Sequence, residues 1–425
     1  MSITHRFMMN SRKLSSALLI FLMMFGCSPA TVTPDIQASP TEAIVTAATL
    51  PIPSATVTPS ATVEPDFPEG CVSLTETPLN PDVLNGLLVV SDFALLNFSS
   101  YFLDPKSNQL LDIETRTQVS WDAPATNVST TKVSPNKKFI QAYLTGKNHD
   151  ILRTVDQVIK TYDTQGQEDW NRGRWLDNEH MFFQYWLVPN GGTIVIYNPF
   201  TGEQKNIQLD LPNPYIVHES LGKVAWVKAD IDPTLKRALY NDKDERLILW
   251  DLDTQKEISS LPSPMDVTDG TWSPDGKEFA IPSPSTVGAP QEIFIMNMEG
   301  AVKKTSLNQK YPFASVSTRP SWSPDGRHIA FWLQVSNTAN TDPKTLRQWL
   351  AITDTTTLET QIYCLSSGKP PTGGWDIVWR PDSTQVIVNT EVLSEEVKPV
   401  LVDLTNMTHS ELDTQGLTVT DWMAP

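Results

Sequence analysis

The side chains that most often carry out catalysis or bind metals are scattered along this chain. It has six histidines in 425 residues, and no two of them stand at metal-ligand spacing. We find no zinc Cys-x-x-Cys pair, phosphate-binding glycine loop, dinucleotide glycine pattern, Gly-x-Ser-x-Gly elbow or EF-hand loop. We therefore expect no metal and no cofactor, and no catalytic residue can be assigned.

One register of charged residues does repeat. Three positions before a tryptophan stand Arg172, Asp269, Arg319 and Asp376, which carry charges of both signs. If these tryptophans end equivalent strands around one channel, the four side chains would form a polar collar at a channel mouth. We expect this collar to contact a ligand or a partner peptide. Mutual ion pairing, or solvated loop charge, is the alternative.

The aspartates of a repeated turn phrase form a second group that could suggest chemistry. Asp275, Asp325 and Asp382 occur one per repeat, so they are not paired carboxylates for acid–base work, and a role in the turn already accounts for them. The tryptophans of the same phrase are expected to be apolar wedges between repeats rather than ligand-stacking rings. They are Trp175, Trp272, Trp322, Trp379 and Trp422.

These residues belong to a phrase, Trp-Ser-Pro-Asp-Gly, that occurs at 272–276 and again at 322–326. Weaker copies stand at 133–137, 175–178, 379–383 and 422–425. Alternating apolar stretches follow, as at 278–281, and alternation of period two is typical of a half-buried strand. Proline, aspartate and glycine in this order favour a type I turn that re-enters a strand through a left-handed glycine. The phrase therefore predicts a turn between two strands.

A third and a fourth strand complete each repeat. Apolar, β-branched or aromatic runs end near Asp or Asn, as at 247–253 and 293–297, and tight-turn residues follow them. Four short antiparallel strands in about 40 to 50 residues are typical of one propeller blade, and a single blade cannot bury both of its faces. The blades must therefore close into a ring.

The repeat count predicts an all-β, seven-bladed β-propeller of four-stranded antiparallel blades. The first-strand ends include a degenerate one near Leu221, and six blades remain the alternative if residues 221–261 are irregular. The last blade is split between the two ends of the chain. We expect an innermost strand at 417–423 to pair with strands at 86–91, 100–103 and 109–113, which hides both sheet edges.

These units resemble the TolB-like, or WD-repeat-like, propeller repeats of bacterial envelope proteins. The resemblance runs from about Val83 to the end and is specific for fold, whereas propellers host many functions. TolB itself carries an α/β domain before its propeller. Here the corresponding stretch is of low complexity, so a Tol-Pal partnership is not implied.

The N-terminus reads as an export signal. Residues 1–26 combine a basic start with a twelve-residue apolar run at 14–25, too short to cross a hydrocarbon core of about 30 Å. Cys27 after Gly26 resembles a bacterial lipoprotein processing site and predicts lipidation of Cys27, although Phe25 and Met24 depart from the usual residues. An ordinary signal peptide that is cleaved nearby is the alternative.

Residues 27–68 are expected to be a lipid-anchored, disordered linker, followed by the propeller domain at 69–425. The linker is rich in Thr, Pro and Ser and could extend at about 3.1 Å per residue, up to roughly 100 Å. Cys71 and Cys364 would remain as an even pair in an oxidising compartment, either as a disulfide that clips the N-terminal segment to the repeat at Trp322 or as two buried thiols.

The charge excludes one class of partner. Removal of residues 1–26 would take away Arg6, Arg12 and Lys13 and change the formal net charge from −17 to −20. A protein with this negative charge repels phosphate backbones, and we therefore expect no nucleic acid partner. We expect a monomeric, exported, lipid-anchored scaffold on the outer side of the bacterial cytoplasmic membrane or elsewhere in the envelope. It would bind a protein or an envelope polymer without catalysis; the alternatives are a glycan-active hydrolase or lyase and a structural spacer.

Overall fold

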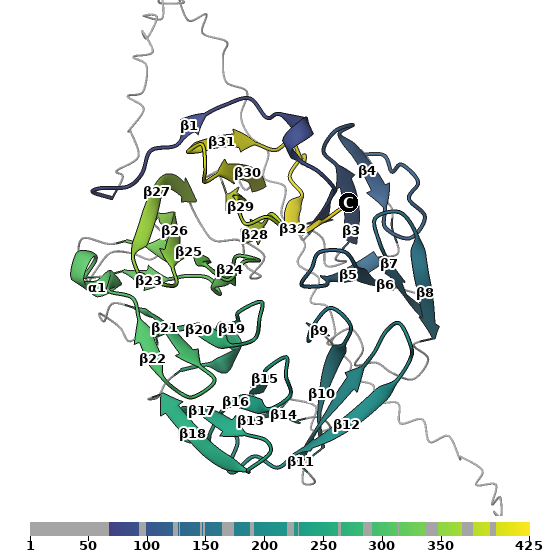
Figure 1. The fold of residues 1–425 in the computed structure, drawn as a ribbon. Coiled ribbons are helices and arrows are strands. Elements are labelled where there is room, and N and C mark those ends of the chain that lie inside the picture. The colour runs from purple at the N-terminus through teal and green to yellow at the C-terminus, as the bar shows by residue number, and fades with distance from the viewer. Residues whose placement is uncertain are drawn as a thin grey trace, which may run out of the picture. The chain divides into compact units, whose positions relative to one another are not determined.

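The computed structural model describes residues 68–425 except 93–98, 122–125, 127, 145–146, 148, 164–173, 188–190, 219–224, 228, 262–264, 284–290, 313, 336–346, 368–376 and 392–396. They lie within a compact unit, Pro65–Pro425. Seven sheets, each with four antiparallel strands and two of them with a fifth strand, surround a central axis in this unit, and we number them blades 1 to 7 (Figure 1). The predicted seven-bladed β-propeller is therefore confirmed.

The strands of each blade are given from the axis outward. Blade 1 contains β32 (Thr418–Met423), β2 (Leu87–Asp92), β3 (Ser99–Asp104) and β4 (Gln109–Asp112). Blade 2 contains β5 (Val128–Val133), β6 (Ile140–Leu144), β7 (His149–Arg153) and β8 (Val158–Asp163). Blade 3 contains β9 (Arg174–Trp175), β10 (Met181–Leu187), β11 (Gly191–Tyr197) and β12 (Gln204–Leu209). Blade 4 contains β15 (Ala229–Ile231), β16 (Arg237–Asn241), β17 (Leu247–Asp251) and β18 (Lys256–Leu261).

The remaining blades follow the same order. Blade 5 contains β19 (Thr271–Trp272), β20 (Glu278–Pro282), β21 (Ile293–Asn297) and β22 (Val302–Lys304). Blade 6 contains β23 (Ser315–Val316) and β24 (Ser321–Trp322), both paired with β25 (His328–Gln334), then β26 (Gln348–Asp354) and β27 (Thr360–Ser367). Blade 7 contains β28 (Ile377–Trp379), β29 (Gln385–Glu391), β30 (Val397–Asp403) and β31 (Thr408–Glu411), with β1 (Thr75–Glu76) outside it.

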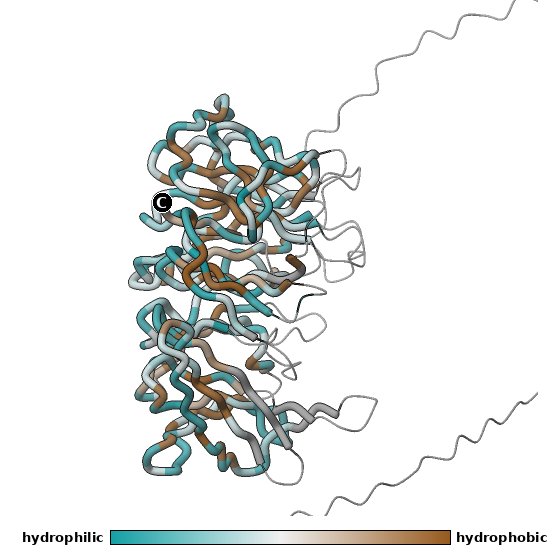
Figure 2. Tube along the Cα trace, turned by 90° about the vertical axis from the view of Figure 1, so that its right-hand side faces the viewer, coloured by the Kyte–Doolittle hydropathy of each residue, from teal (hydrophilic) through white to brown (hydrophobic). Residues whose placement is uncertain are grey.

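The repeated phrase forms the turn that its residues predict. The amide of Gly276 donates to the Ser273 carbonyl at 2.9 Å, and Gly326 does the same to Ser323 at 2.8 Å. The two glycines have φ angles of 68° and 73°, the left-handed region that glycine enters without strain. These turns and their weaker copies lie on one side of the ring, which we call the turn face. Figure 2 shows hydrophilic turns on the left-hand face, where the C-terminus also lies, and apolar strands inside.

Closure follows the prediction. β32 at the end of the chain pairs antiparallel with β2 near its beginning, with Val419 opposite Val90 and Met423 opposite Leu87. Trp422 from β32 is 1% exposed and packs in one apolar cluster with Leu88 and Leu103 of the N-terminal strands. The edge of β2 that faces the channel is therefore covered, because β32 from the opposite end of the chain pairs with it.

The first strand of blade 4 differs from the prediction. Residue 221 lies outside the described residues, and the innermost strand β15 ends at Ile231 instead, before a turn at 232–235 in which Leu235 has a φ of 61°. A two-stranded sheet, β13 (Ile216–His218) with β14 (Ala225–Val227), stands between blades 3 and 4. Because of this inserted sheet, the first strand of blade 4 lies further along the chain than predicted. Its turn follows Ile231 and not a tryptophan, so the sequence pattern did not identify it.

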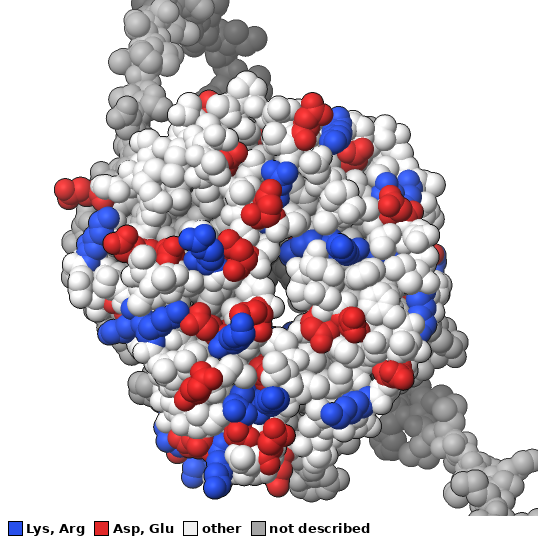
Figure 3. All heavy atoms as spheres, in the orientation of Figure 1, with Lys and Arg blue, Asp and Glu red and all other residues white. Residues whose placement is uncertain are grey.

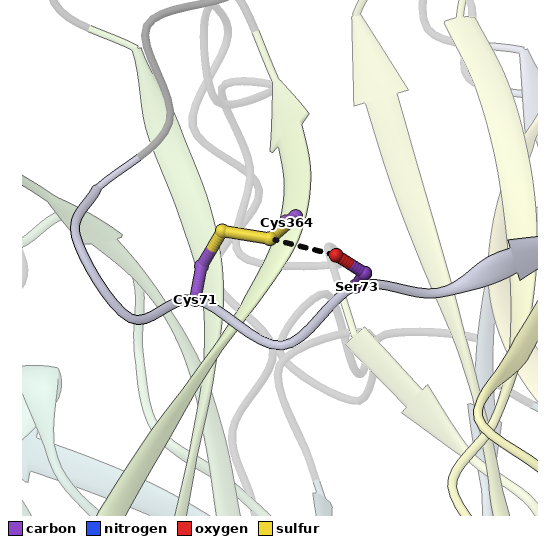
Figure 4. The surroundings of a disulfide bond; sticks show 3 residues. All are labelled: Cys71, Ser73 and Cys364. Carbon is purple, nitrogen blue, oxygen red and sulfur yellow. Dashed lines mark hydrogen bonds between the residues drawn. A yellow bond between two sulfur atoms is a disulfide. The ribbon is translucent and has the colours of Figure 1, made fainter.

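A second connection crosses the outside of the ring. Residues 71–77, which we call the N-terminal strap, run along blades 6 and 7 (Figure 4). Cys71 forms a disulfide with Cys364 of β27, with their Cα atoms 5.2 Å apart, and Val72 bridges in parallel to Tyr363. Thr75 and Glu76 then pair in parallel with β31. The strap therefore ties the start of the propeller to two blades that contain neither chain end.

Candidate functional site

A cavity of about 430 Å³ lies on the ring axis and is lined by residues of all seven blades. Its wall includes four tryptophans, Trp175, Trp272, Trp322 and Trp379. Four prolines of the turn phrases also line it, Pro135, Pro233, Pro274 and Pro324. Figure 3 shows the hollow at the centre of the ring, with basic and acidic residues interspersed around it. An apolar wall with a few charged groups is the usual composition of a binding site.

The tryptophans join neighbouring blades as well as lining the cavity. The indole N–H groups of Trp175, Trp322 and Trp379 donate to Lys132, Thr271 and Ser321, at 2.9, 3.1 and 3.0 Å. Each acceptor is the carbonyl of the innermost strand of the preceding blade. The Trp272 indole nitrogen is buried without a partner in the described part of the chain. These contacts support the interpretation of the tryptophans as wedges.

The residue directly before each tryptophan, or before its equivalent, lies beside the channel. On blades 1 to 4 this position is charged and holds Asp421, Lys132, Arg174 and Asp230. On blades 5 to 7 it is neutral and holds Thr271, Ser321 and Val378. At this position the channel wall is therefore charged on blades 1 to 4 and uncharged on blades 5 to 7, whereas Arg319 of blade 6 lines the cavity from another position.

Two ion pairs connect the charged blades. Lys137 of the blade 2 turn donates to Asp421 of β32 at 2.7 Å, with both side chains about one-fifth exposed. Arg174 of blade 3 pairs with Asp230 of blade 4, whose side chain is 4% exposed. The Arg174 guanidinium also lies 4.4 Å from the centre of the Phe182 ring. Both pairs fix their side chains at the channel wall.

The predicted collar is described only in part. Arg172 and Asp376 lie outside the described residues. Asp269 ends a short 3-10 helix (Val267–Asp269) before β19, and Arg319 lies in the interruption between β23 and β24. Arg319 lines the cavity, and the negative charge of Asp269 acts to raise the pKa of Arg319. The collar as a binding site stays a prediction. Sequence reasoning missed Arg174, Asp230, Lys132 and Asp421, which an alignment of the repeats one residue before the tryptophan would have found.

Arg319 is a cation of the channel itself. Its side chain is exposed, and it faces the cavity, with Nε donating to the Gly270 carbonyl of blade 5. Desolvation within the ring lowers the pKa of Arg319, and the positive charge of Arg174 lowers it further. Asp230 and Asp269 act in the opposite direction.

A buried aspartate, Asp150, lies in blade 2 and interacts electrostatically with the half-buried Lys132. Asp150 is 0% exposed; its Oδ2 accepts from Gln141 at 3.0 Å, whereas Oδ1 has no partner among the described residues. Burial raises the pKa of Asp150 to about 6 and lowers the pKa of Lys132 to about 8, and each charge moderates the shift of the other. Lys132 lines a side cavity of about 280 Å³ with Arg174 and Asp421. Asp150 does not line either cavity, so it cannot reach a ligand in the channel.

Other features bear on metals and membranes. Within the part of the chain that the structure describes, no group of three or more His, Cys, Asp or Glu side chains could hold a metal ion. The described helices include none that is long and apolar enough to cross a membrane.

Comparisons with known proteins give one short match in sequence. No family model matches the chain. A curated protein, the Tol-Pal system protein TolB of Alcanivorax borkumensis, is 34% identical over 83 residues, which are 20% of this chain and 18% of that protein. The chain thus matches less than two thirds of the length of TolB, and the predicted resemblance to TolB is confirmed over this stretch.

Solved structures give more distant matches. TolB from Acinetobacter baumannii has a TM-score of 0.37 and 14% identity, over 79% of this chain and 82% of that one. Kuenenia stuttgartiensis hydrazine synthase has a TM-score of 0.37 and 12% identity, over 68% and 80%. At these TM-scores and identities the structural matches carry no information about activity.

Proposed function

We propose that the protein is a non-catalytic binding scaffold of the bacterial cell envelope, which binds an extended segment of a partner protein in its channel from the turn face. The cavity of about 430 Å³ is the observation that carries this proposal. Its tryptophan and proline wall offers apolar contact area at low conformational cost, and its polar wall residues can fix the orientation of a bound segment. A ring of rigid blades presents these groups already in place.

The arrangement of titratable groups favours binding over catalysis. A glycan-active hydrolase or lyase needs an acid and a base that converge on one point of the cavity. The carboxyl with a raised pKa, Asp150, is 0% exposed and lies away from both cavities. Carboxylates that do line the main cavity, Asp230 and Asp421, are held in ion pairs with Arg174 and Lys137. No observation favours the enzyme alternative.

We infer the cell-envelope location from the N-terminal residues of the sequence, which lie outside the described part of the chain. Residues 1–26 would direct export, Cys27 would carry the lipid anchor, and residues 27–68 would hold the propeller away from the bilayer. The Cys71–Cys364 disulfide supports this location, because such bonds persist in oxidising compartments. We propose a monomeric protein anchored on the outer side of the cytoplasmic membrane or elsewhere in the envelope.

Blocking the channel tests the proposed function. Ser321 lines the cavity from β24, so Ser321→Tyr would fill part of the lumen. Lys205→Tyr places the same side chain on the exposed outer strand β12 and is the matched control. Wild type, S321Y and K205Y would each be cross-linked in the envelope and purified, and the captured proteins identified by mass spectrometry.

We expect wild type and K205Y to capture the same partner and S321Y to lose it, with all three variants folded by circular dichroism. Capture of that partner by S321Y at the wild-type level would show that the channel is not the binding site. Turnover of a glycan substrate that S321Y abolishes would favour the enzyme alternative instead.

A further inference from the structure

Three cations from different blades line the channel and its side cavity. Arg174 of blade 3 and Arg319 of blade 6 both line the main cavity. Lys132 of blade 2 lines the adjoining side cavity together with Arg174. They come from three different blades, so the closure of the ring, and not their order in the sequence, brings them to one lumen.

The bonding of Arg319 leaves most of its guanidinium available. Nε donates to the Gly270 carbonyl, and this is the hydrogen bond that the described residues offer it. No ion pair to Arg319 exists within the described ranges, whereas Arg174 is held by Asp230. A guanidinium has five N–H donors, so the terminal donors of Arg319 are left for a ligand in the cavity that this residue lines.

The like charges act on one another across the lumen. The charge of Arg174 lowers the pKa values of both Arg319 and Lys132. Asp230 and Asp269 compensate Arg319 in part, and Asp150 compensates Lys132. An anion that entered between the two arginines would relieve this repulsion.

We propose that the channel holds a carboxylate of the bound partner segment against Arg319 and Arg174. This inference rests on the proposed function and names the chemical group that the site recognises. The planar forks of arginine match a carboxylate in two-point hydrogen bonding. The group can be the side chain of Asp or Glu or the C-terminal carboxylate of the segment.

The overall charge does not oppose this assignment at contact distance. A formal net charge of −17 repels an acidic segment at long range. That repulsion is screened beyond about 10 Å at 0.1 M salt, whereas a pair enclosed in the channel is screened much less. We therefore expect weaker binding at low salt than a neutral scaffold would show, and retention of the carboxylate contact at physiological salt.

A peptide selection tests the inference. The probe is a library of random twelve-residue peptides with free C-termini, selected on the intact mature protein and counter-selected on S321Y so that only channel binders remain. Each selected peptide is then synthesised with Glu→Gln or Asp→Asn changes, and separately with an amidated C-terminus. Affinities are measured on wild type, Arg319→Gln, Arg319→Glu and the control Lys205→Gln.

We expect neutralisation of one carboxylate to weaken binding to wild type and K205Q by about tenfold or more, and to have little effect on R319Q. The amidated arm shows whether that carboxylate is the C-terminal one. R319E should select Lys- or Arg-containing peptides instead. An equal loss on wild type and R319Q would overturn the carboxylate contact while the proposed function stands. Failure to select any channel-dependent peptide would overturn the proposed function, and the inference with it.

Discussion

At the scale of single residues, the repeated side chains have defined mechanical roles. In the turn phrase, the Ser323 hydroxyl donates to the Asp325 carboxylate at 2.6 Å, and the Asp325 carboxylate accepts the Arg327 amide at 3.0 Å. These bonds account for the aspartate without any catalytic role and lower the pKa of Asp325 against the effect of its desolvation. The Trp322 indole N–H of the same phrase donates to the innermost strand of the preceding blade.

The indole hydrogen bond can be separated from the packing of its ring. Trp322→Phe removes a donor and leaves the Thr271 carbonyl without its partner at 3.1 Å, whereas Trp272→Phe removes an indole N–H that has no partner among the described residues. We expect W322F to lose about 1 to 2 kcal/mol more unfolding free energy than W272F. Urea unfolding followed by circular dichroism measures this; equal losses would mean that the hydrogen bond contributes nothing.

The Asp150 carboxyl makes stability depend on pH. Its folded pKa, about 6, is above the ordinary value of 3.8, so the folded state holds this proton more tightly than the unfolded state does. The stabilisation is complete below the ordinary value and is lost as pH rises toward 6. The shift corresponds to about 3 kcal/mol, because one pKa unit is worth about 1.4 kcal/mol.

Asp150→Asn removes this carboxyl. We expect the unfolding free energy of wild type, relative to that of D150N, to fall between pH 4 and pH 6, in urea titrations at matched ionic strength. Parallel pH curves for the two proteins would contradict the assignment.

At the scale of elements, the ring is closed twice. β32 completes blade 1 from the opposite end of the chain, and the N-terminal strap bridges blades 6 and 7. The strap adds backbone pairing to the outer strand β31, an edge that would otherwise be exposed. The interruption between β23 and β24 in blade 6 has a different role, since it places Arg319 in the channel.

The disulfide of the strap should contribute measurably to stability. It closes a loop of 293 residues, and loss of a native disulfide typically costs about 2 to 5 kcal/mol. We expect the Cys71→Ser, Cys364→Ser double variant to unfold at lower urea than wild type in oxidising buffer. The C71S single variant, as the control, should match the double variant. A wild-type midpoint for the double variant would show that the strap is held by its backbone pairing alone.

At the scale of the whole molecule, one end of the chain is proposed to anchor a binding ring to a membrane. The channel is apolar at its tryptophans and prolines; the position before each tryptophan is charged on blades 1 to 4 and neutral on blades 5 to 7, and blade 6 adds the cation Arg319. A wall of this kind can orient a bound segment as well as hold it. The linker would place that wall at a distance from the bilayer.

The anchor depends on one cysteine outside the described residues. We expect Cys27→Ala to move the protein from the membrane fraction to the soluble exported fraction and to abolish incorporation of a radiolabelled fatty acid. The control, Ser28→Ala, keeps Gly26 and Cys27 and should behave as wild type. Unchanged membrane association of C27A, without fatty-acid labelling in either protein, would favour the ordinary signal peptide.

Local sequence patterns were enough to predict a closed ring of four-stranded blades. Turn chemistry and alternation act between neighbouring residues, so the phrase at Trp272 and Trp322 predicted four-stranded units, and the unpaired strand at the C-terminus predicted where they close. The match of β32 to β2 confirms that reasoning. The first strand of blade 4 was predicted at the wrong position, because its turn lacks the tryptophan and an inserted hairpin precedes it.

The side chains that meet in the channel could not be predicted from the sequence and are known from the tertiary structure. The residues one and three positions before a tryptophan are two apart, so an alternation of period two places both on the same face of a strand and cannot distinguish them. Strand twist and the approach of other blades select Arg174 and Asp230 as partners. The same approach brings Arg319 and Arg174 to one cavity, although 145 positions separate them in the chain.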